Sequence, residues 1–374
     1  MSVEIKENQL IMDGSELIIE SLARSGADVF IGYPITPANL LYSNSLERFP
    51  SFFAAPDEIS ALQWMCGFST TGKFPVTATS FPGFALMLES VNMAYMMELP
   101  MLIILVQRLG PATGSATCGA QGDLALLTGA ISGGFSLPVI SVSSMKDCWE
   151  LSHNAMKMAI DLRTPVVLLT SKEEIMTLAS FAISQLSEIN LLERKQYSGA
   201  ETFVPYKTNE TLVPDFLPVG DKKNQVRYTA STHDQKGIIQ NTSKEAIDNT
   251  KRLELKHQKN LKHHLYYEYD GEKGANTLLI SYGITASASR EAVKNLREQG
   301  EKVSLLIPKT LLPVAPEYFD IIEKYNKIVI AEENLSGQYR KILFGEFGNK
   351  KVSGVNGIAE MITPDRITEV VLSK

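Results

Sequence analysis

Apolar residues occur along the chain in short blocks that alternate with longer stretches of helical periodicity. The blocks typical of buried strands lie at 29–32, 76–78, 101–107, 139–142 and 166–170. The stretches with apolar residues on one helical face lie at 14–25, 57–71, 84–97 and 146–162, and a further helix is expected from the end of the 108–122 loop to about residue 133. Because parallel strands need crossover helices of this length, the pattern predicts an α/β domain with a mostly parallel, doubly wound sheet.

The composition changes after residue 172. Residues 173–273 are richer in charged and polar side chains, and they predict a long irregular crossover that is helical around 243–265. We expect the histidines of this helix, His257, His263 and His264, to be exposed to solvent. From residue 275 the alternation returns, with strands at 277–281, 302–307, 328–331 and 352–355, and it predicts a second, smaller doubly wound domain. The predicted division of the chain is 1–185, 186–272 and 273–374.

Composition and charge narrow the class of function. Hydrophobic residues make up 44% of the 374 residues and charged residues 21%, as in ordinary globular proteins. The formal net charge of -6 leaves no basic excess for a phosphate backbone, so we expect no nucleic-acid partner. The longest apolar runs, such as 101–106, are too short to span a membrane, and the first fourteen residues are too polar for a signal peptide. Three widely separated cysteines without a C-x-x-C pair indicate a reducing cytoplasm, and no metal or cluster site in this chain.

Three loops follow predicted strands at the edge where open α/β sheets bind ligands. They span 33–37, 56–58 and 108–123. Arg108 directly follows the strand 101–107; it could hold a carboxylate through two parallel hydrogen bonds, or it could pair with a local acid such as Asp123. Glu58 begins an apolar helix, where an acid also complements the helix dipole. Thr36 could offer its hydroxyl to a ligand or could be an ordinary turn residue.

Several common catalytic motifs do not occur in the sequence. It holds neither a P-loop nor G-x-G-x-x-G, so a nucleotide phosphate site is not indicated. It also lacks G-x-S-x-G, and no cysteine stands in a context typical of a catalytic nucleophile.

A set of motifs resembles, in order and spacing, the alpha subunits of 2-oxoacid:ferredoxin oxidoreductases. In the first domain they are Gly32-Tyr33-Pro34-Ile35-Thr36-Pro37, Asp57-Glu58-Ile59-Ser60-Ala61, Thr77-Ala78-Thr79-Ser80 with Pro82-Gly83, Gln107-Arg108-x-Gly110-Pro111-x-Thr113-Gly114 and Gln121-x-Asp123-Leu124. The crossover and the last domain add Leu217-Pro218-x-Gly220, Thr232-His233-Asp234 and Glu332-Glu333-Asn334-x-x-Gly337-Gln338. The resemblance covers nearly the whole chain and is nearest to the 2-oxoglutarate type.

The resemblance implies a thiamine diphosphate enzyme that is divided between chains. This chain would supply a pyrimidine-type thiamine diphosphate-binding domain with a doubly wound parallel sheet, and a smaller transketolase C-terminal-like α/β domain. The beta subunit of the family binds the diphosphate with Mg²⁺ through a G-D-G…N motif and carries a [4Fe–4S] cluster. Neither Gly122-Asp123 nor Gly220-Asp221 continues as G-D-G in this chain. The resemblance also allows separate gamma and ferredoxin-type delta subunits, with ferredoxin as the electron acceptor.

The same resemblance assigns roles to the loop residues. Glu58 matches the glutamate that hydrogen-bonds N1′ of the aminopyrimidine and favours the imino tautomer, which takes the proton from C2 of the thiazolium. Arg108 matches the arginine that holds the 2-oxoacid carboxylate, and Thr36 matches the threonine near substrate and cofactor. The other site residues implied are Pro34 and Ile35 for the cofactor, and Gly110 and Thr113 for the substrate. The implied reaction is oxidative decarboxylation of a 2-oxoacid, with 2-oxoglutarate favoured, to acyl-coenzyme A and CO₂.

Several positions depart from the family pattern: Ser15 stands where Asn is usual, Ala112 stands where Ser is common, and Ser115-Ala116 departs from the usual small-Pro pattern. The largest departure is at Phe81. Where T-S-G-P-G is usual, the chain has Thr79-Ser80-Phe81-Pro82-Gly83, and Phe81 adds bulk and removes the conformational freedom of glycine. Two alternatives therefore stay open at this point. One is a non-redox thiamine diphosphate enzyme subunit, and the other is a divergent, non-catalytic assembly subunit.

Overall fold

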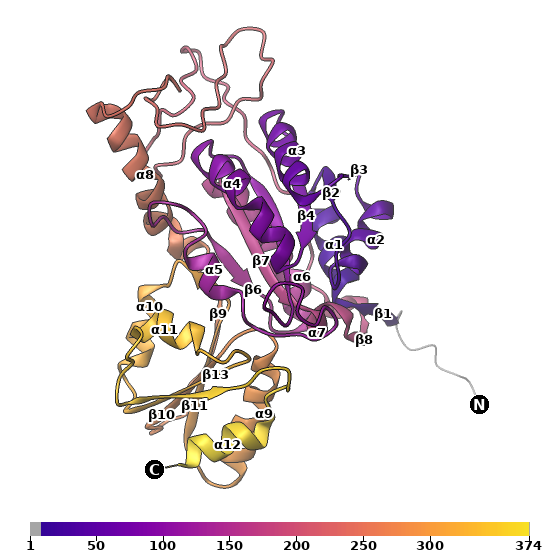
Figure 1. Cartoon of the computed structure of the whole chain (residues 1–374), viewed down its shortest axis with the longest axis vertical. Helices are drawn as coiled ribbons and strands as arrows, with labels where there is room; N and C mark the ends of the chain where they lie inside the picture. The colour runs from indigo at the N-terminus through magenta and orange to yellow at the C-terminus, as the bar shows by residue number, and fades with distance from the viewer. Residues whose placement is uncertain (1–8, 374) are drawn as a thin grey trace, which may run out of the picture.

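The computed structural model describes residues 9–373, which fold into two α/β units joined by an irregular crossover (Figure 1). Of the first fourteen residues of the sequence, residues 1–8 lie outside this range. In Figure 1 the C-terminal unit, drawn in orange to yellow, lies below the N-terminal unit, and the crossover loops extend above it.

A seven-stranded sheet forms the centre of the N-terminal unit. Its spatial order is β12 (Thr310–Leu312), β6 (Val139–Ser141), β7 (Pro165–Ser171), β5 (Met101–Gln107), β4 (Pro75–Thr79), β2 (Val29–Gly32) and β3 (Ser51–Ala54). All neighbours from β6 to β3 run parallel, which agrees with the mostly parallel sheet predicted from the apolar blocks. The antiparallel edge strand β12 comes from the last third of the chain and pairs with β6, so the C-terminal part of the chain completes the first sheet.

Helices cover both faces of this sheet. One face carries α3 (Glu58–Thr70), α4 (Phe81–Met96) and α5 (Leu124–Thr128), and the other carries α1 (Gly14–Ser25), α2 (Asn39–Arg48), α6 (Met145–Leu162) and α7 (Lys172–Met176). Alternate residues of β5 enter the two cores: Ile103 faces α3 and α4, and Ile104 faces α1 and α6. Because both faces are covered, β5 is apolar at nearly every position rather than at every second one.

The helix expected to continue to about residue 133 is shorter than predicted. α5 ends at Thr128, and Gly129 follows it. Gly133 and Gly134 then adopt φ of +84° and +81°, which a right-handed helix does not contain. The helix therefore ends early because the two glycines form a turn, although the spacing of apolar residues predicted a longer helix.

A two-stranded ribbon and the crossover connect the units. β1 (Gln9–Asp13) pairs antiparallel with β8 (Leu178–Ala182), and the 3₁₀ turn η1 (Ile183–Gln185) follows. After a long irregular path comes α8 (Lys244–Asn260), which ends in a second 3₁₀ turn, η2 (Leu261–His263). This matches the predicted irregular crossover with one helix, while the ribbon was not predicted.

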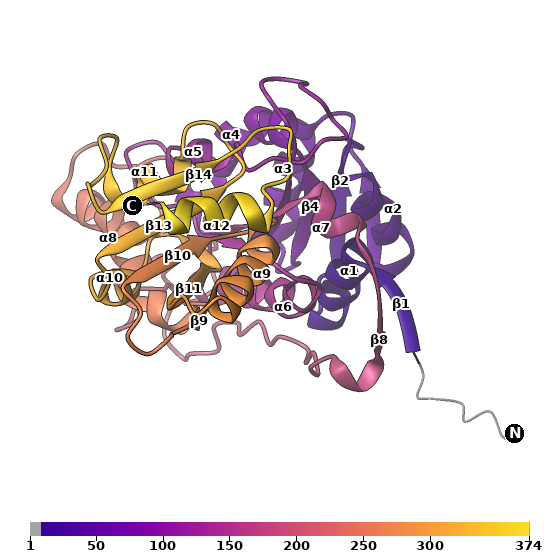
Figure 2. The ribbon, with the colours of Figure 1, turned by 90° about the horizontal axis from the view of Figure 1, so that it is seen from below.

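The C-terminal unit is a five-stranded sheet between helices. Its order is β14 (Val352–Asn356), β13 (Lys327–Glu332), β10 (Thr277–Ser281), β11 (Val303–Pro308) and β9 (Tyr267–Asp270), and β9 alone among these runs antiparallel to its neighbour. The helices of this unit are α9 (Thr285–Glu298), α10 (Pro316–Ile322), α11 (Gln338–Phe344) and α12 (Pro364–Leu372). Figure 2 shows α9 and α12 side by side on one face, and their buried residues form a separate core.

The other face of this sheet shares its core with the first unit. Leu278 and Ile280 of β10 belong to the same buried cluster as Ile103 of β5, whereas Leu279 belongs to the core under α9 and α12. The two units therefore share one continuous core. The division of the chain into 1–185, 186–272 and 273–374 remains a proposal.

A buried group of charges fastens α8 to the N-terminal unit. Glu98, fully buried just before β5, accepts hydrogen bonds from Lys256 Nζ at 2.8 Å and from Arg252 Nη1 at 3.1 Å. Burial disfavours the charged carboxylate of Glu98, but Lys256 and Arg252 outweigh burial and lower its pKa to about 2. The expectation that the histidines of this region are solvated is wrong for two of them: His257 is 1% exposed and His264 2%, because α8 packs its polar face inward.

Replacing Glu98 by glutamine is expected to destabilise the chain by about 3 kcal/mol, because two buried cations would lose their counter-charge. Denaturant unfolding at pH 7 measures this loss. The exposed pair Lys244–Asp248 on the same helix provides the control: Asp248→Asn should change the free energy of unfolding little. The contribution of the Glu98 charge is present above pH 4.5 and is lost as the pH falls toward 2, so the two proteins should converge in acid. Equal stability of Glu98→Gln and the parent at pH 7 would contradict the assignment.

Candidate active site

The three predicted site loops follow β2, β3 and β5, three of four adjacent strands. β3, β2, β4 and β5 are neighbours in that order, and the chain leaves β2 for β3 on one side and returns to β4 on the other. This reversal is the topological switch point at which doubly wound sheets bind ligands beyond the carboxyl ends of the strands. Thr36 follows β2, Glu58 follows β3 and Arg108 follows β5.

Arg108 is a buried cation without an acidic partner. Its side chain is 5% exposed, Nη1 donates a hydrogen bond to the carbonyl oxygen of Thr36 at 2.5 Å, and Nε has no partner. Within residues 9–373 it forms no ion pair, so the alternative in which Arg108 pairs directly with Asp123 is wrong. The carbonyl of Thr36 orients the guanidinium without neutralising it, which leaves charge and donors for an anionic ligand.

The loop after Arg108 folds back on itself. Leu109 pairs with Ser115 in an isolated antiparallel bridge, and Gly114 turns the chain with φ of +49°. A Cβ at Gly114 would lie 1.8 Å from the carbonyl oxygen of Leu109, so the turn requires glycine. Gly110 and Thr113 are exposed on this turn, beyond the buried guanidinium.

Thr36 lies in a short loop with Pro34 and Ile35. Its side chain is half-buried, and Oγ1 accepts a hydrogen bond from Asn39 Nδ2 at 3.2 Å. Ile35 packs against the core under α1 and α6, whereas Pro34 is exposed. The structure thus brings Thr36 into direct contact with Arg108 through its backbone and leaves the hydroxyl at the edge of the site.

Glu58 occupies the first position of α3 and is 6% exposed. Asp57 caps this helix by accepting a hydrogen bond from Ser60 N at 2.7 Å, so Glu58 is not needed as the cap. A Cβ at Gly83 would approach Glu58 Oε1 to 2.7 Å and Thr79 Oγ1 to 2.1 Å, which places the carboxyl directly against the start of α4. Within residues 9–373 no hydrogen bond or ion pair engages this carboxyl. A buried carboxyl in this state fits a ligand that donates a hydrogen bond.

Replacing Gly83 by alanine is expected to lower stability by about 1–3 kcal/mol, because the added methyl overlaps Thr79 and the Glu58 carboxyl. Thermal unfolding measures the change. Gly67→Ala is the matched control, since a Cβ there meets nothing within 4 Å in the exposed middle of α3 and should not destabilise the chain. A Gly83→Ala protein as stable as Gly67→Ala would show that Glu58 moves freely.

Phe81 does not disturb this arrangement. It is the first residue of α4, is half-buried, and does not have a positive φ. The backbone at this position therefore does not need glycine. Gly83, two residues later, is the glycine on which the approach of Glu58 depends.

Gln121 joins the Arg108 loop to the C-terminal unit, a contact that sequence patterns did not reveal. Its Nε2 donates to the carbonyl of Tyr282 at 2.7 Å, and its Oε1 accepts from Thr285 Oγ1 at 2.6 Å and from Glu333 N at 2.7 Å. Its backbone carbonyl accepts from Asn334 Nδ2 at 3.1 Å. Two motifs far apart in the sequence, at 121–124 and 332–338, thus meet at one joint. The signal that the sequence offered for this contact was the polar residues in these motifs that had no assigned ligand role.

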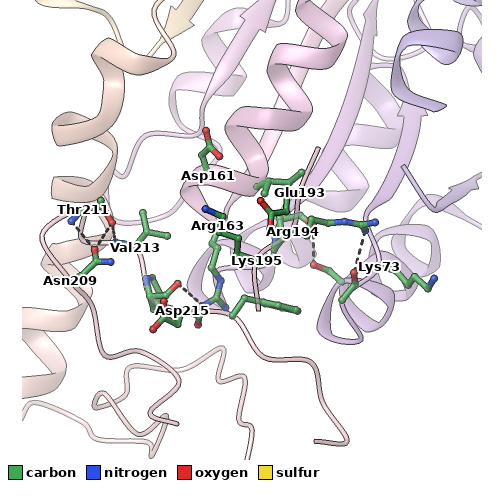
Figure 3. Close-up of a pocket in the computed structure, with 16 residues that line it drawn as sticks. Lys73, Asp161, Arg163, Glu193, Arg194, Lys195, Asn209, Thr211, Val213 and Asp215 are labelled. Carbon is green, nitrogen blue, oxygen red and sulfur yellow. Dashed lines mark hydrogen bonds between the residues drawn. The ribbon is translucent and has the colours of Figure 1, made fainter. Parts of the chain in front are cut away.

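A cavity of about 320 Å³ lies at the amino ends of the strands, opposite the end that holds the candidate site (Figure 3). Lys73 and Arg163 line it just before β4 and β7, at the amino ends of the strands. Two of its cations have partners: Arg194 pairs with Asp28, and Arg163 donates to the carbonyl of Asp215 at 2.6 Å. This cavity is therefore separate from the candidate site.

The described part of the chain contains neither a metal-binding cluster nor a membrane-spanning helix. Within residues 9–373, no three His, Cys, Asp or Glu side chains gather so that they could hold a metal ion. None of the helices in the same range is long and apolar enough to cross a membrane.

Comparison with known proteins identifies the family. The model described as "Pyruvate flavodoxin/ferredoxin oxidoreductase, thiamine diP-bdg" matches residues 20–252. The chain belongs to this family. A second model, "Pyruvate:ferredoxin oxidoreductase core domain II", matches residues 275–361 of this oxidoreductase chain.

Named relatives within the family are subunits. The 2-oxoglutarate synthase subunit KorA of Methanocaldococcus jannaschii is 29% identical over 88% of this chain and 90% of its own length. The ketoisovalerate oxidoreductase subunit VorB of Methanothermobacter marburgensis is 26% identical over 92% of each chain.

Solved structures agree with this assignment. The structure of 2-oxoglutarate:ferredoxin oxidoreductase from Magnetococcus marinus, with 2-oxoglutarate, coenzyme A and succinyl-CoA bound, has a TM-score of 0.90 at 28% identity. It covers 98% of this chain, which spans 65% of that longer one. An inactive beta4 tetramer of a split gene transketolase has a TM-score of 0.52 at 14% identity and shares the fold alone.

These findings confirm the resemblance drawn from the motifs, the α/β thiamine diphosphate-binding fold class, and the assignment to a subunit of a 2-oxoacid:ferredoxin oxidoreductase. The alternative of a non-redox thiamine enzyme subunit is less well supported, because the matching relatives carry oxidoreductase or synthase names.

Proposed function

We propose that this chain is the alpha subunit of a 2-oxoglutarate:ferredoxin oxidoreductase that is active only with a beta subunit. The reaction would convert 2-oxoglutarate and coenzyme A to succinyl-coenzyme A, CO₂ and one proton, with two electrons passed singly to ferredoxin. The observation that carries the proposal is the buried Arg108, oriented by the Thr36 carbonyl and without an acidic partner, at the switch point that also holds Glu58. The named relatives of the 2-oxoglutarate type support this choice of 2-oxoacid.

Each site residue of this chain would have its own role in the reaction. Glu58 would hold a proton against the N1′ ring nitrogen of the aminopyrimidine, because its buried carboxyl has no other partner. Arg108 would bind the substrate carboxylate with two parallel hydrogen bonds, and the Thr36 hydroxyl would face the same ligand. Gly110 and Thr113, on the exposed turn, would close over the substrate, and Pro34 and Ile35 would shape the loop beside the cofactor. Thiamine diphosphate, when bound, supplies the sink for the electron pair that stays on the substrate carbon when CO₂ departs.

The remaining components are assigned to other chains. We propose that the beta subunit holds the diphosphate with Mg²⁺ and carries the [4Fe–4S] cluster, since the three cysteines here are far apart and no G-D-G motif is present. Coenzyme A is the co-substrate, and separate gamma and ferredoxin-type delta subunits complete the proposed complex. The free thiols of Cys66, Cys118 and Cys148 support a cytoplasmic location.

The test is an anaerobic assay of this chain co-expressed with its beta-type partner. We expect viologen reduction that requires both chains, thiamine diphosphate and coenzyme A, with 2-oxoglutarate preferred over pyruvate and branched 2-oxoacids. Preference for another 2-oxoacid would correct the substrate alone. A complex with thiamine diphosphate and an intact cluster that reduces no dye with any 2-oxoacid would overturn the proposal and favour a divergent assembly subunit.

A further inference from the structure

Asp123 is a buried carboxyl that accepts no hydrogen bond from any residue in the described range 9–373. It is 4% exposed, and its Oδ2 is fully buried without a hydrogen-bond partner. It stands at the position before α5 where an aspartate normally accepts a hydrogen bond from the helix backbone, yet its side chain accepts none. Asp13 and Asp57 do cap their helices in this way, so the side chain of Asp123 is directed elsewhere.

The backbone holds Asp123 in this place. Its carbonyl accepts hydrogen bonds from Leu126 N at 3.1 Å and from Leu127 N at 3.3 Å. Two residues earlier, Gln121 is fixed by side-chain and backbone hydrogen bonds to the C-terminal unit. The backbone that carries this carboxyl is therefore held in place by the first turn of α5 and by the contacts of Gln121.

Arg108 is the charged group that faces Asp123. Burial raises the pKa of Asp123 to about 7, and the Arg108 guanidinium offsets part of that rise although the two form no ion pair within 4.0 Å. From the C-terminal unit, Tyr282 faces the same carboxyl, and burial keeps the pKa of its phenol well above the usual range, so it remains neutral. The charge of Asp123 thus depends on whether Arg108 is free or neutralised.

We propose that Asp123 takes up a proton from solvent when a 2-oxoacid carboxylate pairs with Arg108, so that substrate binding is coupled to protonation of this positioning residue. The inference rests on the proposed role of Arg108. A substrate carboxylate cancels the positive charge that favours the Asp123 anion and adds a negative charge nearby. The buried carboxylate then becomes a neutral acid, which removes a repulsion from the substrate and can donate a hydrogen bond.

The coupling sets the sign of the pH dependence. Because burial raises the pKa of Asp123 to about 7, a part of the free sites is unprotonated at pH 7, and binding should take up a fraction of a proton per site from the buffer. Above pH 7 the free site loses this proton, and the KM for the 2-oxoacid should rise about fivefold between pH 7 and pH 8. Below pH 6 the dependence should vanish, because Asp123 is already protonated.

The test compares the alpha–beta complex of the parent chain with those of Asp123→Asn, Glu333→Gln and Arg108→Ala. The assays measure KM and kcat for 2-oxoglutarate from pH 6 to pH 8.5, and calorimetry of 2-oxoglutarate binding in buffers of different ionisation enthalpy counts the protons. Asp123→Asn should bind substrate with a KM that no longer rises above pH 7. Glu333→Gln is the matched control, because Glu333 also has a pKa raised to about 7 by burial, and it should retain the pH dependence.

Each outcome separates the inference from the proposed function. A parent enzyme whose KM is flat from pH 7 to pH 8, or an Asp123→Asn enzyme that keeps the rise, would overturn the coupling while the role of Arg108 stands. Unchanged substrate binding by Arg108→Ala would instead overturn the proposed function. Because asparagine removes a buried charge and keeps the shape of aspartate, Asp123→Asn is expected to fold, and its unfolding temperature verifies this.

Discussion

Glu58→Gln is expected to lower turnover of the alpha–beta complex by roughly 10³-fold while leaving its assembly intact, because the amide cannot share a proton with a ring nitrogen. The side chain is 6% exposed, lies against Gly83 and has no partner within the described chain, so glutamine fits the same space. The loss should fall on kcat, since the substrate is held elsewhere. Anaerobic viologen assays at saturating 2-oxoacid measure it.

The control for this variant is Glu89→Gln, which removes an exposed acid from α4, the helix that begins beside Glu58. It should retain full activity. Thiamine diphosphate content should be measured in both complexes, because weaker cofactor binding and slower chemistry are different results. Full activity of Glu58→Gln would remove this residue from the mechanism.

Arg108→Ala should raise the KM for the 2-oxoacid by roughly 10²- to 10³-fold, because a buried charged hydrogen-bond pair with the substrate carboxylate would be lost. The same change leaves the carbonyl of Thr36 without its donor. Initial rates over a range of 2-oxoacid concentration, at fixed coenzyme A, measure the effect. The KM for coenzyme A should change much less.

Arg108→Lys is the informative companion variant. Lysine keeps the charge but has no planar fork, so it cannot reach both the Thr36 carbonyl and the substrate with the same geometry. An intermediate KM is expected. If Arg108→Ala and the parent share one KM, Arg108 does not bind the substrate and another cation must do so.

The parts of the fold that depend on local chemistry could be predicted from the sequence. β5 was evident because a strand covered on both faces is apolar throughout, and the loop after it was evident from glycine and proline. The approach of Thr36 to Arg108 followed in outline from the rule that parallel strands end at one edge. These features need no knowledge of distant partners.

Features made by residues far apart in the sequence could not be predicted in this way. The polar sequence of α8 is typical of a solvated helix, yet Lys256 is buried because Glu98, 158 residues before it, supplies the matching charge, and His257 is buried in a stack on Tyr95. β12 joins the first sheet from the far end of the chain, and nothing in its three residues indicates this. An ion pair between Arg108 and Asp123 was one alternative open from the sequence, but pairing depends on side-chain orientation, and in the structure Asp123 Oδ2 has no hydrogen-bond partner.

The joint at Gln121 bears on how such enzymes exchange parts during evolution. Two of its partners, the carbonyl of Tyr282 and the amide of Glu333, are backbone groups that any residue except proline provides. Three further partners are side chains, the hydroxyls of Thr285 and Tyr282 and the amide of Asn334, and must be present at those positions. A recombined chain could therefore take its C-terminal half from a divergent homologue and keep a working substrate loop, provided that these three side chains came with it.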